Sequence, residues 1–251
     1  MTSHTVLRRA EAVIDGLGAP VSMRDLLRYP LAKAEAQLAK NPAWPVLSLP
    51  LTLGAAFGMD DAAAIDLASS CLLLYGFADL TDDAQDGDLR GDWGWQRAVN
   101  AGNTLSFLGS EVLAALSLPD APRLALVAAY AKAGRLMTFG QEGDLLARYP
   151  HVPSVEDYLR MVAGKSGASA AFFASSPALA TGRPATEVEA LRTYGESLGL
   201  YVQILSDLAD YSGEESQDHR NQQVTLPVIF ALAQAPEAGD RLRQALQDPS
   251  Q

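Results

Sequence analysis

Apolar residues recur at steps of three and four along most of this chain, and this period constrains the fold more than any other feature. Residues three and four apart lie on one face of an α-helix, so the pattern predicts amphipathic or buried helices. The alternation of β-branched residues that is typical of strands is scarce. The predicted fold class is therefore all-α. The segments that carry the period are 62–80, 104–116, 124–139, 155–175, 188–211 and 225–235.

Prolines and glycines separate these segments. Pro42, Pro45 and Pro50 interrupt the first third of the chain, and a polar loop is expected at 87–94. No change of composition marks a linker, so residues 1–251 are predicted to form a single domain. Because 48% of the residues are hydrophobic, this domain can bury a sizeable core.

The charge balance restricts the classes of partner. The chain has 19 Lys and Arg against 30 Asp and Glu, a net charge of −11, which argues against sequence-independent binding of nucleic acid. A polyanionic substrate would need metal ions or a local basic cluster. The apolar runs 49–53 and 71–74 are far shorter than the ~20 residues of a membrane span. No apolar stretch follows the N-terminus, and Cys71 has no second cysteine to pair with. A cytoplasmic protein without an integral membrane segment is expected.

Two acidic clusters each follow an apolar helical segment. The first contains Asp82, Asp83 and Asp86, and the second contains Asp207 and Asp210. Anions at the C-terminal end of a helix cost roughly 0.3–1 kcal/mol each, and like charges four residues apart add a similar penalty. A divalent cation would compensate. Oxygen ligands without His or Cys nearby favour Mg²⁺, which also coordinates substrate phosphates.

Two other interpretations of the clusters were weighed. Acidic helix ends can simply be solvated, but two such ends after apolar helix bodies make this interpretation less favoured. The first cluster also fits part of a calcium-binding EF-hand loop. In that register Ala84 and Trp93 would occupy ligand positions three and twelve, and neither can bind a cation, so the EF-hand is rejected.

The residues then resemble those of a known family, the trans-isoprenyl diphosphate (polyprenyl) synthases. Asp82-Asp83-Ala84-Gln85-Asp86 is similar to the family's first aspartate-rich motif, and Gln203-Ile204-Leu205-Ser206-Asp207-Leu208-Ala209-Asp210 to its second. Five further segments match in family order: Leu89-Arg90-Gly91, Asn100-Ala101-Gly102-Asn103, Gly140-Gln141-Glu142-Gly143-Asp144-Leu145, Gly164-Lys165-Ser166-Gly167-Ala168 and Thr225-Leu226-Pro227-Val228. The resemblance implies the isoprenoid synthase fold, a single all-α bundle of about ten or more helices around a central apolar cavity.

The resemblance also implies roles for individual residues. Two or three Mg²⁺ ions would bridge an allylic diphosphate to five aspartates: Asp82, Asp83, Asp86, Asp207 and Asp210. The diphosphate would be contacted by Arg90, Lys165 and Arg220, and the reacting end by Lys165, Gln203 and Gln141. Phe77, Leu74 and Ala78 would line the hydrocarbon pocket, and an aromatic Phe77 suggests a short chain. As alternatives, Gln141 and Gln203 form purely structural hydrogen bonds, and Arg90 is an exposed loop residue.

The chain departs from the family pattern where a second substrate, isopentenyl diphosphate, would bind. The basic segment that grips it in the family matches Lys40-Asn41-Pro42-Ala43-Trp44-Pro45, where Trp44 replaces an arginine. Only Arg90 remains of an arginine pair, Gln222-Gln223 stands where a lysine is expected, and Ser206 replaces an aspartate. Each charge-assisted contact is worth ~1.5–3 kcal/mol. We therefore expect an intact allylic site beside a degenerate isopentenyl site.

Four functional interpretations follow. The first is a prenyl diphosphate synthase with a weak second site, and the second is a single-substrate terpene synthase that cyclises or hydrates its substrate. The third is a non-catalytic modulatory subunit of an active synthase, and the fourth is a helical binding protein without diphosphate chemistry. The resemblance implies a homodimer, with a heterodimer as the alternative, a prenyl diphosphate as the substrate, and no nucleic-acid partner.

Overall fold

A computed structural model describes residues 2–210, 221–234 and 242 of the chain. The described residues are almost all helical, and their only strand-like pairing is one isolated bridge between Arg148 and Gln223. The all-α prediction is therefore confirmed. The helices are α1 Ser3–Gly16, α2 Val21–Lys40, α3 Pro45–Ala56, α4 Asp61–Asp86, α5 Trp95–Ala114, α6 Asp120–Leu146, α7 Val155–Val162, the π-helical η1 Ala163–Gly167, α8 Ala168–Ala180, α9 Ala185–Ala209 and α11 Leu226–Gln234.

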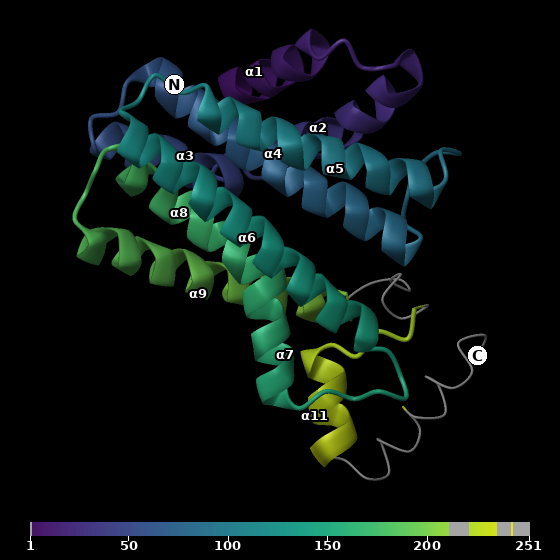
Figure 1. Cartoon of the computed structure of the whole chain (residues 1–251). Coiled ribbons are helices and arrows are strands. Elements are labelled where there is room, and N and C mark those ends of the chain that lie inside the picture. The colour runs from purple at the N-terminus through teal and green to yellow at the C-terminus, as the bar shows by residue number, and fades with distance from the viewer. Residues whose placement is uncertain (1, 211–220, 235–241, 243–251) are drawn as a thin grey trace.

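Helix α4 runs through the centre of the bundle. It lies side by side with α5 and also packs against α1, α2, α3, α6 and α8, while α9 packs on the far side of α8 (Figure 1). Its leucines form the middle of the core, and Leu67, Leu72 and Leu73 are fully buried. Burial of this apolar face, rather than helix propensity, therefore accounts for most of the stability of α4.

Both ends of α4 carry recognisable capping residues. The Asp60 side chain caps the N-terminus by accepting hydrogen bonds from the backbone of Ala62 and Ala63. Gly87 ends the helix in the left-handed conformation, with φ of 82°, as its position after the acidic cluster predicted. By length and composition α4 also passes as a membrane span, but 67% of the apolar window is buried inside the bundle. The short apolar runs in the sequence did not predict so long an apolar helix.

The structure corrects the expectation that prolines break the first third of the chain. Pro45 is the first residue of α3, where a proline removes no hydrogen bond that the helix would otherwise make. Pro50 lies inside α3 and is buried. Pro30 is likewise buried inside α2. Packing against the core outweighs the hydrogen bonds that these prolines cannot donate.

The predicted helix over 155–175 is divided into three parts. Ser154 caps α7 by accepting from the backbone N–H of Asp157 at 3.1 Å. The chain then widens into η1 before it continues as α8. Short π-helical segments inside α-helices occur frequently at functional sites, because the extra residue shifts the side chains that follow. The segment η1 contains Lys165.

Candidate active site

A cavity of about 1020 Å³ lies among the inner faces of the helices. One part is apolar and is lined by Phe77, Ala78, Met137, Ala170 and Phe173, with Val46 nearby on α3. The other part is acidic. Its carboxylates come from α4, α6 and α9 with their flanking residues, and are Asp79, Asp82, Asp86, Asp88, Glu142, Asp144, Asp207 and Asp210. Among the described lining residues Lys165 is the only Lys or Arg. A hydrocarbon and a metal-bound anion would fit the two parts.

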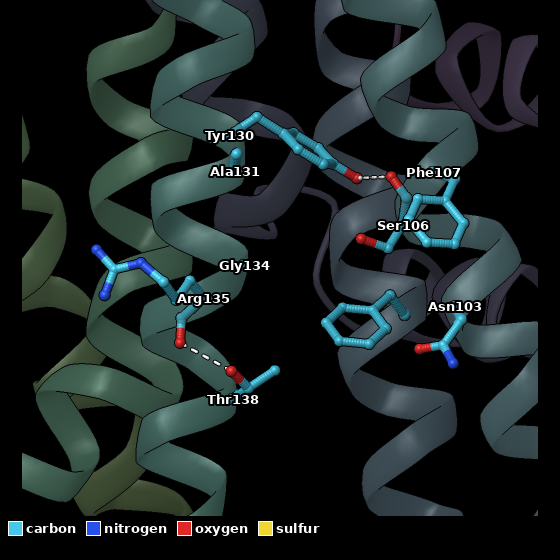
Figure 2. Close-up of a pocket in the computed structure, with 9 residues that line it drawn as sticks. Asn103, Ser106, Phe107, Tyr130, Ala131, Gly134, Arg135 and Thr138 are labelled. Atoms are coloured by element: carbon cyan, nitrogen blue, oxygen red, sulfur yellow. Dashed lines mark hydrogen bonds between the residues drawn. The ribbon is translucent and has the colours of Figure 1, made fainter.

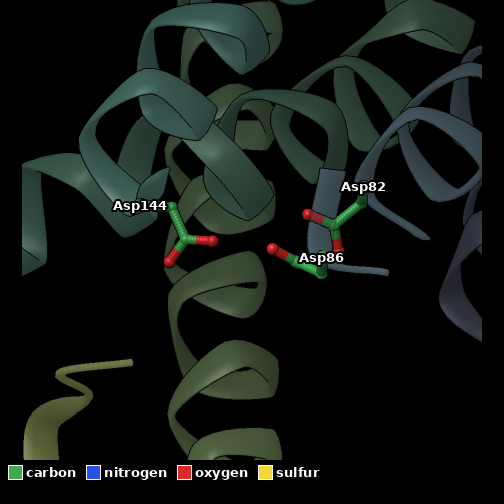
Figure 3. A group of neighbouring side chains, drawn as sticks. All are labelled: Asp82, Asp86 and Asp144. Carbon is green, nitrogen blue, oxygen red and sulfur yellow. The ribbon is translucent and has the colours of Figure 1, made fainter. Parts of the chain in front are cut away.

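Three carboxylates from two helices form the centre of the acidic part. Asp82 and Asp86 project from the last turns of α4, and Asp144 projects from the end of α6 (Figure 3). One ligand oxygen of each lies within 4.8 Å of the others. The three donors are oxygens, the kind of ligand that Mg²⁺ prefers. Asp144 was not predicted as a ligand, because nothing in the sequence shows that the end of α6 meets the end of α4.

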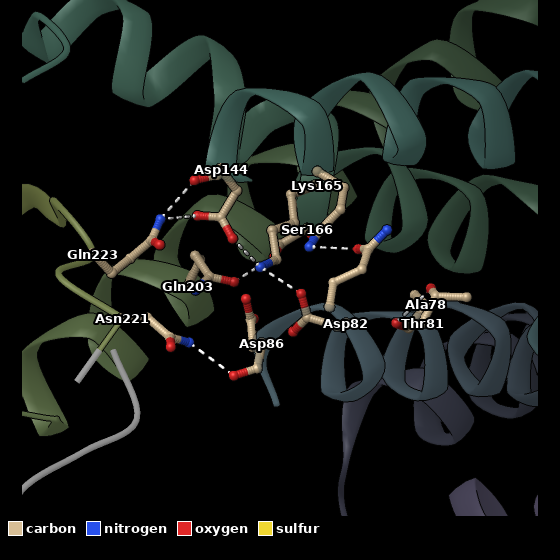
Figure 4. A network of polar contacts seen from close by, with 12 residues as sticks. Ala78, Thr81, Asp82, Asp86, Asp144, Lys165, Ser166, Gln203, Asn221 and Gln223 are labelled. Carbon is tan, nitrogen blue, oxygen red and sulfur yellow. Dashed lines mark hydrogen bonds and ion pairs between the residues drawn. The ribbon is translucent and has the colours of Figure 1, made fainter. Parts of the chain in front are cut away.

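Lys165 occupies the middle of this cluster. Its Nζ lies 2.9 Å from Oδ1 of Asp82 and 2.5 Å from Oδ2 of Asp144 (Figure 4). Burial works against the positive charge, but the two carboxylates outweigh it and raise the pKa of Lys165 above its usual range. The lysine is therefore charged at neutral pH, and it neutralises part of the repulsion between aspartates that face one cavity.

Two contacts hold Asp86 in this cluster. Its Oδ1 accepts a hydrogen bond from Nη2 of Arg148 at 2.7 Å, and its backbone carbonyl accepts one from Nδ2 of Asn221 at 2.9 Å. Burial raises the pKa of Asp86 to about 6, and the adjacent Asp82 carboxylate adds to the effect. A cation bound beside it would oppose both causes.

Gln223 fixes the third carboxylate. Its Nε2 donates to the backbone carbonyl of Asp144 at 2.8 Å and to Oδ1 of the same residue at 2.9 Å. Burial raises the pKa of Asp144, although Lys165 acts in the opposite direction. The contacts of Gln223 and of Arg148 could not be predicted from the sequence, because both residues act across helices that are distant in the chain.

A close contact between two backbones positions Lys165. A Cβ atom added to Gly140 of α6 would lie 2.0 Å from the backbone nitrogen of Lys165 and 2.5 Å from the carbonyl carbon of Gly164. A Cβ on Gly164 would lie 2.9 Å from Cα of Gly140. Only glycines permit this approach. This pair of glycines lets η1 lie directly against α6. Lys165 of η1 therefore reaches Asp144 of α6.

The second acidic cluster differs from the first. Asp207 is buried, with 3% of its surface exposed, and it lines the cavity. It accepts hydrogen bonds from the Tyr158 hydroxyl and, at 2.9 Å, from Nε2 of Gln203. Ser166 in turn donates to Oε1 of Gln203 at 2.6 Å. Burial raises the pKa of Tyr158 above its usual range, and the Asp207 carboxylate adds to this. Asp210 also lines the cavity.

The structure does not bring every predicted site residue into the cavity. Asp83 points to α2, where it accepts from the Tyr29 hydroxyl at 2.6 Å and from Lys33 at 2.7 Å. It is not among the lining residues, so its placement argues against the predicted ligand role. The reason is helical spacing, since Asp82 and Asp86 share the cavity face and Asp83 lies to one side of it.

The remaining predicted residues differ in whether they line the cavity. Gln141 lines the cavity and donates to Oε1 of Gln85 at 3.1 Å. Arg90 follows α4, is exposed, and is not among the residues that line the cavity. Leu74 is fully buried in the core and does not line it either, which corrects the predicted pocket role. Arg220 lies outside the described residues.

A smaller cavity of about 190 Å³ opens between α5 and α6 (Figure 2). Tyr130 crosses it and donates to the backbone carbonyl of Ser106 at 2.9 Å. Phe77, Asn103 and Thr138 line both this cavity and the large one. Phe77 therefore lies at the boundary between the two cavities.

A comparison with protein families matches residues 53–251 to the polyprenyl synthetase family. The chain belongs to this family. It is 31% identical over 208 residues to a (2E,6E)-farnesyl diphosphate synthase of Mycobacterium bovis, and 28% identical over 211 residues to a geranylgeranyl diphosphate synthase of Mycobacterium tuberculosis. These alignments cover 77% and 78% of this chain but 57% and 60% of the relatives. The chain thus spans a little over half the length of these relatives.

A solved structure supports the fold of this polyprenyl synthetase family member. The geranylgeranyl pyrophosphate synthetase of the archaeon Geoglobus acetivorans superposes with a TM-score of 0.78, covering 97% of this chain and 83% of the other, at 24% identity. The isoprenoid synthase fold expected from the sequence is confirmed. At this level of identity the likeness shows the fold alone.

Proposed function

We propose that this polyprenyl synthetase family member is an enzyme that ionises an allylic prenyl diphosphate with Mg²⁺. The observation that carries the proposal is the group of Asp82, Asp86 and Asp144 at the end of a large apolar cavity. A diphosphate and three carboxylates repel one another, so only a bound cation would let them share this space. The chemistry of the donor set fits Mg²⁺.

The residues around the cluster would divide the work. Asp82, Asp86 and Asp144 would hold the metal, and Asp207 of α9 and Asp210 directly after α9 line the same cavity. When bound, Mg²⁺ would withdraw electron density from the leaving diphosphate. Lys165, which pairs with Asp82 and Asp144, would place its positive charge beside the bound diphosphate.

The apolar part of the cavity would hold the hydrocarbon. Phe77, Ala78 and Phe173 offer an environment that excludes water from an allylic cation. Gln141 and Gln203 line the cavity, and their amides would orient the reacting end. Because Phe77 also lines the smaller cavity between α5 and α6, we propose that it limits the substrate to a short chain.

The described cavity offers few positively charged groups that could bind a second diphosphate. Eight carboxylates and one lysine line it, and Trp44, which replaces a family arginine, is buried there. This favours a degenerate isopentenyl diphosphate site. The single-substrate terpene synthase remains the second candidate, because it needs only the metal site and the apolar cavity. A non-catalytic modulatory subunit is less favoured, since it would not need the preserved cluster.

The test is release of diphosphate from geranyl, farnesyl and geranylgeranyl diphosphates, each with and without isopentenyl diphosphate. We expect Mg²⁺-dependent release that isopentenyl diphosphate does not accelerate. Asp82→Asn combined with Asp86→Asn should lower the rate by about a hundred-fold or more, because metal charge stabilisation is lost. Asp83→Asn is the matched control, since that aspartate pairs with Lys33 outside the cavity.

Several results would count against the proposal. Equal rates of diphosphate release by the double variant and the wild type would show that the metal cluster takes no part in the reaction. Efficient formation of longer prenyl diphosphates would overturn the degenerate second site. Product mass would separate a synthase from a cyclase. Light scattering of the purified protein would test the proposed homodimer, and co-purification with an active synthase would favour the heterodimer.

A further inference from the structure

A short backbone ribbon lies beside the acidic cluster. The segment after α6 pairs with the segment before α11 through an antiparallel bridge between Arg148 and Gln223. Two backbone hydrogen bonds, of 2.7 and 3.0 Å, flank this bridge. Val224, next to Gln223, is fully buried in a small apolar core with residues of α7 and α11. This packing fixes the ribbon against the helices that carry the cluster.

The two residues of the bridge each hold one carboxylate of the cluster. Nη2 of Arg148 donates to Oδ1 of Asp86 at 2.7 Å. Gln223 is buried, and its Nε2 donates to Oδ1 of Asp144 at 2.9 Å and to the backbone carbonyl of Asp144 at 2.8 Å (Figure 4). We call Arg148 and Gln223 together the carboxylate clamp. The clamp thus occupies one oxygen of each of two aspartates.

Gln223 determines how the Asp144 carboxylate is turned. Its single donor atom is bonded to both the side chain and the backbone of Asp144, so the carboxylate cannot rotate without losing a hydrogen bond. Oδ1 of Asp144 faces Gln223, whereas Oδ2 lies 2.5 Å from Nζ of Lys165. One oxygen of Asp144 points toward Asp86 and the other turns away (Figure 3). Asp144 therefore presents one oxygen, rather than two, to a cation.

Divalent cations differ in the number of carboxylate oxygens that they take. Ca²⁺ binds about six to eight oxygens in a flexible geometry and frequently takes both oxygens of one carboxylate. Mg²⁺ is smaller, requires an octahedral geometry, and is held by single oxygens of one or two carboxylates together with water and phosphate oxygens. A site whose carboxylates are each limited to one oxygen suits the smaller ion.

We propose that the carboxylate clamp makes this site select Mg²⁺ over Ca²⁺. Gln223 is a positioning residue that acts through Asp144, and Arg148 acts in the same way through Asp86. Ca²⁺ would have to turn either carboxylate and break a hydrogen bond to a charged group, which corresponds to about a ten-fold factor or more in affinity. The inference rests on the proposed metal site but not on the prenyl substrate.

Binding of metal alone measures this selectivity. The full chain is loaded with Mn²⁺, which also takes carboxylate oxygens, and free Mn²⁺ is followed by electron paramagnetic resonance. Mg²⁺ or Ca²⁺ is then added until half of the Mn²⁺ is released. The ratio of the Ca²⁺ to the Mg²⁺ concentration at this point is the selectivity. Asp82→Asn combined with Asp86→Asn identifies the Mn²⁺ that is bound at the cluster.

Two substitutions of Gln223 separate selectivity from overall affinity. Gln223→Met keeps the length of the side chain but removes the donor, so the ratio should shift toward Ca²⁺ by about ten-fold. Gln223→Lys supplies a charged donor, so both ions should bind more weakly while the ratio stays near that of the wild type. Asn221→Ala is the matched control on the same ribbon. Because Asn221 donates to the backbone carbonyl of Asp86, its loss should leave the ratio unchanged.

An unchanged ratio in Gln223→Met would overturn the proposal, because a merely structural residue affects both ions alike. Should this variant fail to fold, Arg148→Met makes the same test at Asp86 and should shift the ratio in the same direction. Mn²⁺ binding that is unaffected by the Asp82→Asn, Asp86→Asn double variant would overturn the clamp together with the metal site.

The clamp can fail independently of the proposed function. Mg²⁺-dependent release of diphosphate with an unchanged ratio in Gln223→Met would overturn the clamp and keep the ionisation of the substrate. A ratio that shifts toward Ca²⁺, with no diphosphate release from any prenyl substrate, would support the clamp and overturn the enzyme activity.

Discussion

Lys165 shows how one side chain can balance a site that is otherwise all acid. It pairs with Asp82 and Asp144, and 20% of its side chain is exposed. Lys165→Met keeps the length but leaves two part-buried carboxylates facing each other. We expect the free energy of unfolding without metal to fall by about 2–3 kcal/mol, near the lower end for breaking a buried ion pair.

Urea unfolding in EDTA and in Mg²⁺ measures this effect. Mg²⁺ should restore most of the lost stability, because it supplies the missing positive charge. Lys132→Met, at an exposed position of α6, is the control and should change stability by less than about 0.5 kcal/mol. A Lys165→Met protein as stable as the wild type in EDTA would show that the aspartates do not need the lysine.

At the residue scale, placement in the cavity could be predicted where it depends on local helix geometry. Asp82 and Asp86 share a helix face by spacing alone, and both line the cavity. Asp144 and Tyr158 could not be assigned in this way, because each depends on a contact between helices that are distant in the chain. The pairing of Asp83 with Lys33 was not expected, because the sequence neighbours of Asp83 gave no sign that α2 would supply this lysine.

At the scale of elements, the contact of α6 with η1 decides where Lys165 lies. Gly140→Ala would place a methyl group 2.0 Å from the backbone of Lys165, so η1 would have to move away. We expect a loss of about 3 kcal/mol in unfolding free energy and weaker Mg²⁺ binding. Thermal unfolding and magnesium titration measure the two effects.

Gly134→Ala is the matched control on the same helix. Its Cβ would lie 3.9 Å from Cδ1 of Leu74, which is ordinary van der Waals contact. Because alanine favours a helix over glycine, this variant should be as stable as the wild type or up to about 1 kcal/mol more stable. Equal effects of both substitutions would show that the close approach at Gly140 does not position Lys165.

The helices themselves were largely predictable, but their interruptions were not. The spacing of apolar residues predicted most of the length of α4, α5, α6 and α9. The three- and four-residue spacing of apolar residues continues through η1. One extra residue per turn does not change this spacing visibly over so short a segment, so the π-helix was not predictable. Helices α1 and α2 were not predicted, because no apolar period was recognised in the first part of the chain. Helix α3 was missed because its prolines resemble breaks until its packing against α4 and α8 is known.

At the scale of the whole molecule, part of the excess of acidic residues lines the cavity. The chain carries a net charge of −11, and eight carboxylates face one space with a single lysine among the described residues. Neither Mg²⁺ nor a diphosphate alone balances this arrangement, but the two together do. We therefore predict that they bind cooperatively and stabilise the folded chain.

The melting temperature measures this coupling. Ligands at a hundred times their dissociation constant contribute about 2.7 kcal/mol. For a chain of this size, that raises the melting temperature by about 5–10 °C. Mg²⁺ alone should give a smaller shift and diphosphate alone none, because the aspartates repel it. The Asp82→Asn, Asp86→Asn double variant should lose the joint shift. An equal shift with diphosphate in EDTA would mean that basic residues outside the described cavity, rather than metal, hold the anion.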